Sequence, residues 1–157
     1  MENCEFCNLF PEDEKWLFYT SDFWEIYLSN KQDYIGRCIV VSKRHCESLS
    51  SLSIQEWDDL KYIVNSLEKM FSETLNATMF NWSCLMNNAY KKDDSQPHVH
   101  FHFRPRFKQP VEINHKEYYD EEFAHHYKND KETKLDNRSK EALFKMLKLN
   151  VEMYFIK

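Results

Sequence analysis

The chain has 157 residues, of which 42% are hydrophobic and 16% aromatic, so we expect one globular domain with its own core and exclude a disordered chain. Its net charge of -5 argues against a general nucleic-acid binder but leaves room for a local cationic pocket. No apolar run is long enough to cross a bilayer, and the first residues lack the pattern of a signal peptide, so we expect a cytoplasmic location and no membrane partner.

The first third of the chain predicts three strands. Residues 16–20 and 23–29 are rich in aromatic and branched side chains and are separated by a Ser-Asp turn. Residues 35–42 contain three consecutive β-branched side chains, which are typical of a buried strand. This third segment also contains Gly36, the only glycine of the chain.

An amphipathic helix follows these strands. Ser53 is the expected N-cap, and Glu56 three residues later completes a capping-box pattern. Apolar residues then recur at intervals of three or four, as in a helix that packs one face on a sheet. This stripe consists of Ile54, Trp57, Leu60, Val64, Leu67, Phe71 and Leu75. We expect it to be part of the core and not a binding groove.

The second half predicts two more strands and a helical tail. Residues 78–86 read as a strand and residues 87–95 as a polar loop, after which a histidine-rich strand begins at residue 98. Beyond Arg106 the signals weaken, but apolar residues recur at helical spacing at Leu143, Leu147, Val151 and Tyr154. Strands, a helix, two strands and a mostly helical tail predict an α+β domain with an antiparallel sheet.

The most informative segment is His98-Val99-His100-Phe101-His102-Phe103. Successive side chains of a strand point to opposite faces, so the three histidines would share one face and the three apolar residues the other. On a helix, each histidine would be rotated by about 200° from the previous one. A row of imidazoles on one sheet face predicts phosphate chemistry or metal binding, and the alternative is a histidine-rich solvent face.

This segment, followed by Arg104, resembles the His-φ-His-φ-His-φ signature of the histidine triad (HIT) family of nucleotide hydrolases and transferases, in which φ is apolar. Residues 35–45 resemble the family's strand that ends in a Lys/Arg-His pair. Asn87 and Ser95, eleven and three residues before His98, stand where the family has side chains near the phosphates.

The resemblance covers residues 4–107 and implies a HIT-like fold. We expect an antiparallel sheet of about five strands with one long helix and a mostly helical C-terminal tail. Residues 1–107 would form the catalytic domain, and residues 108–157 an extension packed on the same domain. Segment 123–127 suggests the bacterial-type subgroup. Many members are dimers, so we also expect a homodimer.

The resemblance implies a mechanism in which His100 attacks the α-phosphorus of a nucleotide, usually of adenine. Water then resolves the nucleotidyl-histidine and releases AMP, which splits one difficult displacement into two easier ones. The substrate would be a nucleoside phosphoramidate or a dinucleoside polyphosphate. His102 would contact phosphate oxygens and His98 would hold the site in position. The expected substrate contacts are Asn87, Ser95, Asn30 near the ribose, and Arg37.

Two departures from the family pattern bear on this reading. The family usually has histidine where this chain has Arg37, and an arginine cannot shuttle a proton, although it can bind phosphate through two nitrogens. Residues 93–94 are aspartates where a glycine is usual. The alternative function is therefore a catalytically weak nucleotide-binding module or sensor. The negative charge argues against a third reading, a repair factor that removes adenylyl groups from DNA ends.

The N-terminus contains a Cys-x-x-Cys pair, Cys4 and Cys7. By resemblance to bacterial members of the family, these two thiols would bind a structural zinc together with His45 and His98. Such a site would orient the strand that carries His100. The alternatives are two free cysteines at a frayed terminus, or Cys46 as a replacement ligand.

Overall fold

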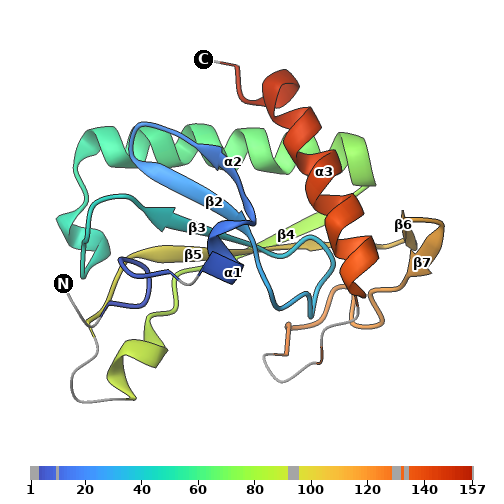
Figure 1. Ribbon diagram of the computed structural model, residues 1–157, viewed down its shortest axis with the longest axis horizontal. Helices are drawn as coiled ribbons and strands as arrows, with labels where there is room; N and C mark the ends of the chain where they lie inside the picture. Colours follow the sequence, from blue (N-terminus) through green and yellow to red (C-terminus); the bar gives the residue numbers. More distant parts are fainter. Residues whose placement is uncertain (1–3, 10, 92–95, 129–131, 133–134, 157) are drawn as a thin grey trace.

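The computed structural model describes residues 4–9, 11–91, 96–128, 132 and 135–156, and it confirms the α+β class. Five strands form one antiparallel sheet in the order β1-β2-β3-β5-β4. They are β1 (Leu17–Thr20), β2 (Trp24–Leu28), β3 (Cys38–Ser42), β4 (Met79–Ser83) and β5 (His100–Arg106). Figure 1 shows the long helix α2 (Ile54–Leu75) along one face of the sheet and α3 (Asn137–Tyr154) crossing beside it.

Short elements complete the fold. They are α1 (Pro11–Glu14), the 3-10 helices η1 (Leu49–Ser51) and η2 (Asn87–Tyr90), and a hairpin of β6 (Val111–Ile113) and β7 (Lys116–Tyr118). The amino-acid pattern beyond Arg106 does not predict this hairpin. Its two turn residues, Asn114 and His115, both have positive φ, 51° and 61°, which is the geometry of a two-residue hairpin turn. Within the described ranges, neither long helix combines the length and apolarity that a membrane span requires.

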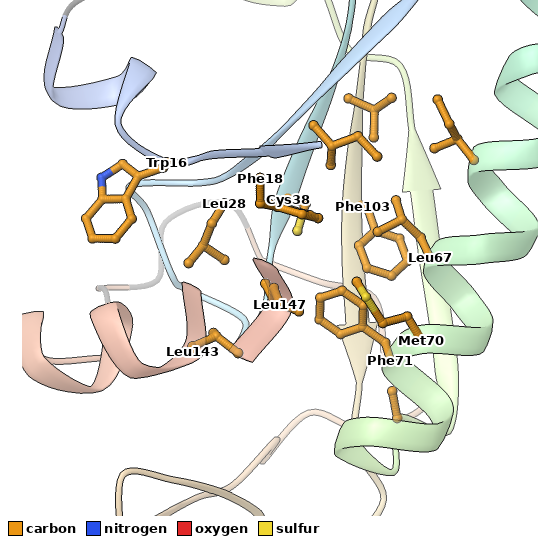
Figure 2. Packing of buried hydrophobic residues seen from close by; sticks show 14 of the residues in the cluster. Trp16, Phe18, Leu28, Cys38, Leu67, Met70, Phe71, Phe103, Leu143 and Leu147 are labelled. Carbon is orange, nitrogen blue, oxygen red and sulfur yellow. The ribbon is translucent and has the colours of Figure 1, made fainter. Parts of the chain in front are cut away.

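The core lies between the sheet and helices α2 and α3 (Figure 2). Phe103 of β5 packs edge-on against Phe71 of α2, with ring centroids 5.0 Å apart. Leu143 and Leu147 of α3 are fully buried in the same cluster. Burial of each such side chain stabilises the fold by about 1.5–3 kcal/mol. The contact between Phe103 and Phe71 therefore fixes which face of β5 points toward the core. The even-numbered residues of β5 therefore face the opposite side of the sheet.

Helix α2 begins as the sequence predicts. The Ser53 hydroxyl accepts a hydrogen bond from the backbone N–H of Glu56, and the Glu56 carboxylate accepts one from the backbone N–H of Ser53. The prediction that the whole apolar stripe is part of the core is wrong for two of its residues, however, because Ile54 is 77% exposed and Trp57 is 42% exposed. Buried polar residues occupy the inner face of these first turns: Glu56 pairs with Arg44, and Asp59 accepts a 2.5 Å bond from Ser21.

Strand β3 begins at Cys38 and not at residue 35, because Gly36 has a φ of +80° that interrupts the extended backbone. A Cβ at Gly36 would lie 2.5 Å from Cε1 of Phe71 and 3.1 Å from Cγ of Pro105. Glycine is therefore required here both for its backbone conformation and for the close approach of α2 and β5.

Replacing Gly36 by alanine is expected to lower the free energy of unfolding by about 2–4 kcal/mol, which combines the left-handed backbone with an overpacked core. Urea unfolding followed by circular dichroism measures this change. Asn114→Ala is the matched control, because Asn114 has a similar positive φ but is exposed, so its loss should be about 1 kcal/mol. Equal losses in the two variants would contradict the steric part of the argument.

A buried arginine ties the C-terminal part of the chain to β5. Arg106 is 0% exposed and pairs with Asp120 through Nε and Nη2, at 2.6 and 3.1 Å. Its Nη1 donates to Asn81 Oδ1 and to the carbonyl of His125, both at 3.0 Å. The backbone carbonyl of Glu122 also accepts from Nη2. Residues 120–125 are thus held against the strand that carries the histidines.

Candidate active site

The three alternating histidines lie together on one face of the sheet, as the strand pattern predicts. His100 and His102 are in β5, opposite Val41 and Ile39 of β3, and His98 lies two residues before the start of the strand. All three line one cavity of about 300 Å³. The intervening Val99 is fully buried on the other side. The alternative of a solvent face is wrong, because His98 and His100 are only 4% and 7% exposed.

The tautomer of His100 is fixed by the backbone. Its Nδ1 lies 2.8 Å from the carbonyl oxygen of His98. A carbonyl can only accept, so Nδ1 carries the proton and Nε2 keeps its lone pair. Burial, with a further contribution from the charge of Arg37, lowers the pKa of His100. The ring is therefore neutral at physiological pH, which is the form of an imidazole that can act as a nucleophile.

His102 lies beside His100, with the two ring centroids 4.9 Å apart and the rings perpendicular. Its Nδ1 is 3.3 Å from Nη2 of Arg37. Burial, followed by electrostatic interactions with His100, Arg37 and Arg104, lowers the pKa of His102 to about 3. This ring is therefore neutral as well.

Phe6, which is not among the predicted site residues, packs against the central histidine. Its ring centroid is 4.3 Å from that of His100, and it lines the cavity. Its position between the two cysteines of the Cys-x-x-Cys pair is the sequence feature from which a place near the site could have been predicted. Other apolar residues of the cavity wall include Leu9, Ile39, Val41 and Met86. This wall gives the cavity an apolar part next to the imidazoles.

The predicted substrate contacts lie in different places. Asn30 lines the cavity, where its side-chain oxygen accepts a 2.5 Å bond from Lys140 of α3 and its nitrogen donates to Asp13 of α1. Asn87 is exposed in η2, and its neighbour Asn88 lines the cavity. Ser95, like Asp93 and Asp94, lies outside the described residues. Lys140 and Asp13 belong to no recognisable sequence motif, so their contacts with Asn30 become apparent only in the folded structure.

Cys4, Cys7, His45 and His98 form a cluster whose ligand atoms all lie within 4.8 Å of one another. The sulfur-to-Nδ1 distances are 3.2 Å for Cys4–His98, 3.4 Å for Cys7–His45 and 3.6 Å for Cys7–His98. Ligands of a tetrahedral zinc would be about 3.6 Å apart, given bonds of about 2.3 Å to sulfur and 2.1 Å to nitrogen. The four residues therefore fit a zinc ion.

The second ring nitrogen of His98 supports this fit. Nε2 lies 2.7 Å from the carbonyl oxygen of Ser42, so it carries the proton and leaves Nδ1 free to bind a cation. Burial and the neighbouring Cys4 raise the pKa of Cys7 to about 11, and a bound cation would reverse this effect by stabilising the thiolate. Cys46 instead donates to the carbonyl of Ser48 at 3.1 Å.

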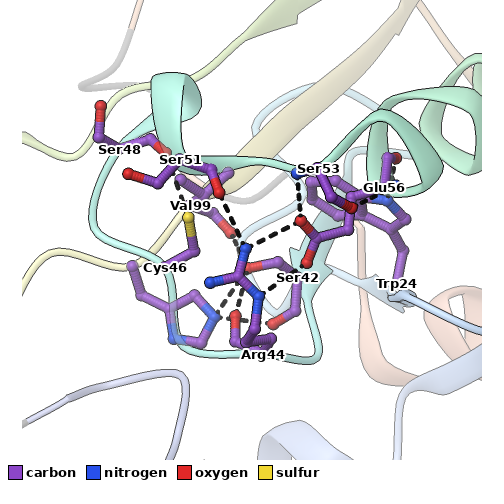
Figure 3. Close-up of polar contacts among 10 residues, drawn as sticks. Trp24, Ser42, Arg44, Cys46, Ser48, Ser51, Ser53, Glu56 and Val99 are labelled. Carbon is purple, nitrogen blue, oxygen red and sulfur yellow. Dashed lines mark hydrogen bonds and ion pairs between the residues drawn. The ribbon is translucent and has the colours of Figure 1, made fainter.

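The loop that carries His45 is braced on both sides (Figure 3). Arg44 binds the Glu56 carboxylate through Nε and Nη2, at 3.0 and 2.9 Å, and this pair lowers the pKa of Glu56. The backbone N–H of Val99 donates to the carbonyl of Cys46 at 2.7 Å. These bonds connect the loop to α2 and to the histidine strand, and so position His45 for the cluster.

Comparison with known proteins agrees with this geometry. The HIT domain family model matches residues 11–109, although no curated protein is significantly similar in sequence. A hypothetical histidine triad nucleotide-binding protein from Sulfolobus tokodaii has a TM-score of 0.63 at 17% identity, over 88% of this chain and 84% of its own. A diadenosine triphosphate hydrolase from Plasmodium falciparum, solved with cyclomarin A, has a TM-score of 0.60 at 17% identity, over 92% and 81%.

A zinc-bound histidine triad family protein from Mycobacterium smegmatis has a TM-score of 0.57 at 14% identity, over 87% of this chain and 86% of its own. At these identities the solved structures show a shared fold alone. The family model is more informative, because it spans more than half of the chain and includes the three alternating histidines. The protein therefore belongs to the histidine triad (HIT) family.

Proposed function

We propose that the protein is a nucleotide hydrolase or transferase that forms a covalent nucleotidyl-histidine on His100. The observation that carries this proposal is the Nδ1–H bond from His100 to the His98 carbonyl, which leaves a neutral Nε2 in a buried cavity. Membership of the histidine triad family supports the same class of chemistry, and a diadenosine triphosphate hydrolase is one protein with the same fold. The substrate would be a dinucleoside polyphosphate or a nucleoside phosphoramidate.

The reaction would take two steps. In the first, Nε2 of His100 attacks the α-phosphorus, and the bond to the leaving group breaks with its electron pair. The Nδ1–H bond to the His98 carbonyl would stabilise the positive charge that the ring acquires. In the second, water attacks the phosphorus, the bond to Nε2 breaks, and the proton of the water passes to solvent as AMP is released. A transferase would use another acceptor in place of water.

The cavity can hold a nucleoside. Its volume of about 300 Å³ is at the lower end of the range for small-molecule sites. Phe6 and Leu9 would contact the base, and Asn30 and Asp13 the sugar hydroxyls. Asn87, Ser95 and Arg37 remain predicted phosphate contacts. An adenine preference, a homodimer, a cytoplasmic location and a domain boundary after residue 107 likewise remain predictions.

We also propose that Cys4, Cys7, His45 and His98 bind zinc, supported by their geometry and by the zinc-bound relative. Four protein ligands fill a tetrahedral shell, so the ion would be structural and would leave no position for substrate. It would link the N-terminal segment, including Phe6, to the strand that carries His100.

The direct test is the release of AMP from diadenosine polyphosphates and from adenosine phosphoramidate. Intact-mass spectrometry of the protein, quenched during turnover, should show one added adenylyl group. Tight AMP binding with no turnover on either substrate class would overturn the proposal. That result would favour the alternative hypothesis of a nucleotide-binding module or sensor, which is based on the presence of arginine at position 37.

A further inference from the structure

Arg37 is a buried cation with a carboxylate on one side and a histidine on the other. The residue is 9% exposed and lines the cavity. Its Nη1 lies 3.0 and 2.9 Å from the two carboxylate oxygens of Asp33, which is itself 2% exposed. One end of the guanidinium is thus already bound by a protein carboxylate, and this pairing lessens its capacity to bind a phosphate through two nitrogens.

The other end of the guanidinium meets His102, at 3.3 Å between Nη2 and Nδ1. A guanidinium has only donors and keeps its charge in proteins, so Nδ1 must be the accepting, unprotonated nitrogen. The proton of the neutral His102 ring is therefore on Nε2. This is the opposite tautomer to that of His100, whose proton is on Nδ1.

Cations on two sides keep the His102 ring from taking a second proton. Arg104 is 1% exposed, lies on the same face of β5 and stacks on Tyr127, with 4.2 Å between its guanidinium carbon and the ring centroid. The charges of Arg37 and Arg104 and the neighbouring His100 all disfavour an imidazolium at His102, as does burial, and Asp33 is engaged by Arg37.

We propose that Arg37, braced by Asp33, is a positioning residue that holds His102 as a neutral Nε2–H donor, and that the site therefore favours phosphoanhydride over phosphoramidate substrates. This inference rests on the proposed function. His102 can donate a hydrogen bond to a phosphate oxygen but has no acidic proton to give away. When Nε2 of His100 bonds to the α-phosphorus, the bond to the bridging oxygen breaks, and the rest of the substrate, a nucleoside diphosphate or longer polyphosphate, leaves as an anion without a proton. An amine leaving group needs a proton, which His102 would not supply.

The tautomer can be measured without any substrate. Long-range proton–nitrogen correlation spectra of protein labelled with 15N in histidine, with His102 assigned through His102→Gln, should show Nε2–H at neutral pH. Arg37→Met should abolish the fixed tautomer, whereas Arg37→Gln keeps a donor and should retain it. Arg138→Met, at an exposed position on α3, is the matched control and should change nothing. A wild-type His102 that is Nδ1–H or doubly protonated would overturn the proposal.

The leaving-group preference has its own readout. The ratio of kcat/KM for diadenosine triphosphate to that for adenosine phosphoramidate should favour the anhydride in the wild type and fall at least about tenfold in Arg37→Met. If Arg37→Met does not fold, Asp33→Asn/Arg37→Met removes both buried charges and replaces it. A wild type that prefers the phosphoramidate would overturn the substrate inference. A protein inactive on both would contradict the proposed function, while the spectra would still decide the role of Arg37.

Discussion

Turnover falls on the order of 10⁶-fold when His100 is replaced by alanine, because the variant lacks the atom that forms the covalent bond. Nucleotide binding should persist, since most of the cavity wall comes from other residues. Steady-state AMP release measures the first effect and calorimetric titration with AMP the second. His115→Ala is the matched control, because the side chain of His115 is 96% exposed and lies in the β6–β7 turn.

The intermediate gives a second, independent readout of the same variant. Wild-type protein should gain one adenylyl group during turnover, and His100→Ala should gain none. A variant that still hydrolyses substrate at more than a few per cent of the wild-type rate would show that another group attacks the phosphorus. The proposed mechanism would then have to be abandoned, although the fold and the family would stand.

Removal of the proposed zinc is expected to lower the stability of the fold strongly. At free zinc about 1,000-fold above Kd, the ion would stabilise the fold by about 4 kcal/mol. For a domain of this size, that loss would lower Tm by about 8–16 °C. Cys4→Ser/Cys7→Ser should lose one zinc per chain by elemental analysis and show this shift by differential scanning calorimetry.

Cys46→Ser separates the two predicted ligand sets. Cys46 is buried like Cys4, but its thiol bonds to the carbonyl of Ser48. This variant should keep its zinc and most of its stability. Full zinc content in Cys4→Ser/Cys7→Ser, or its loss in Cys46→Ser, would contradict the assigned cluster.

The parts of the fold that sequence predicts well are those with strong local signals. The alternation of residues 98–103 can satisfy only a strand with one buried and one functional face, and the Ser53–Glu56 box marks a helix start directly. The stripe on α2 is less reliable at its beginning. There the buried positions belong to Glu56 and Asp59, whose partners Arg44 and Ser21 come from other elements, so no periodicity reveals them.

The candidate site likewise combines residues with a local sequence pattern and residues that only the fold brings together. The histidines and cysteines carry recognisable spacing, so their clustering can be expected before the fold is known. The role of Arg37 depends on Asp33 and His102, and only the register of β3 against β5 brings that histidine within reach. Lys140 reaches Asn30 from a helix 110 residues away in sequence. Long-range polar contacts of this kind leave no local pattern.

The family match ends before the molecule does, at both ends of the chain. A fragment trimmed to residues 11–109 would discard Cys4 and Cys7 on one side and Asp120 on the other. It would keep His45 and His98 but lose the other two proposed zinc ligands. It would also leave the buried guanidinium of Arg106 without its carboxylate partner, at a cost of about 3–5 kcal/mol. Contacts that stabilise the histidine strand therefore come from residues on both sides of the range that the family model matches.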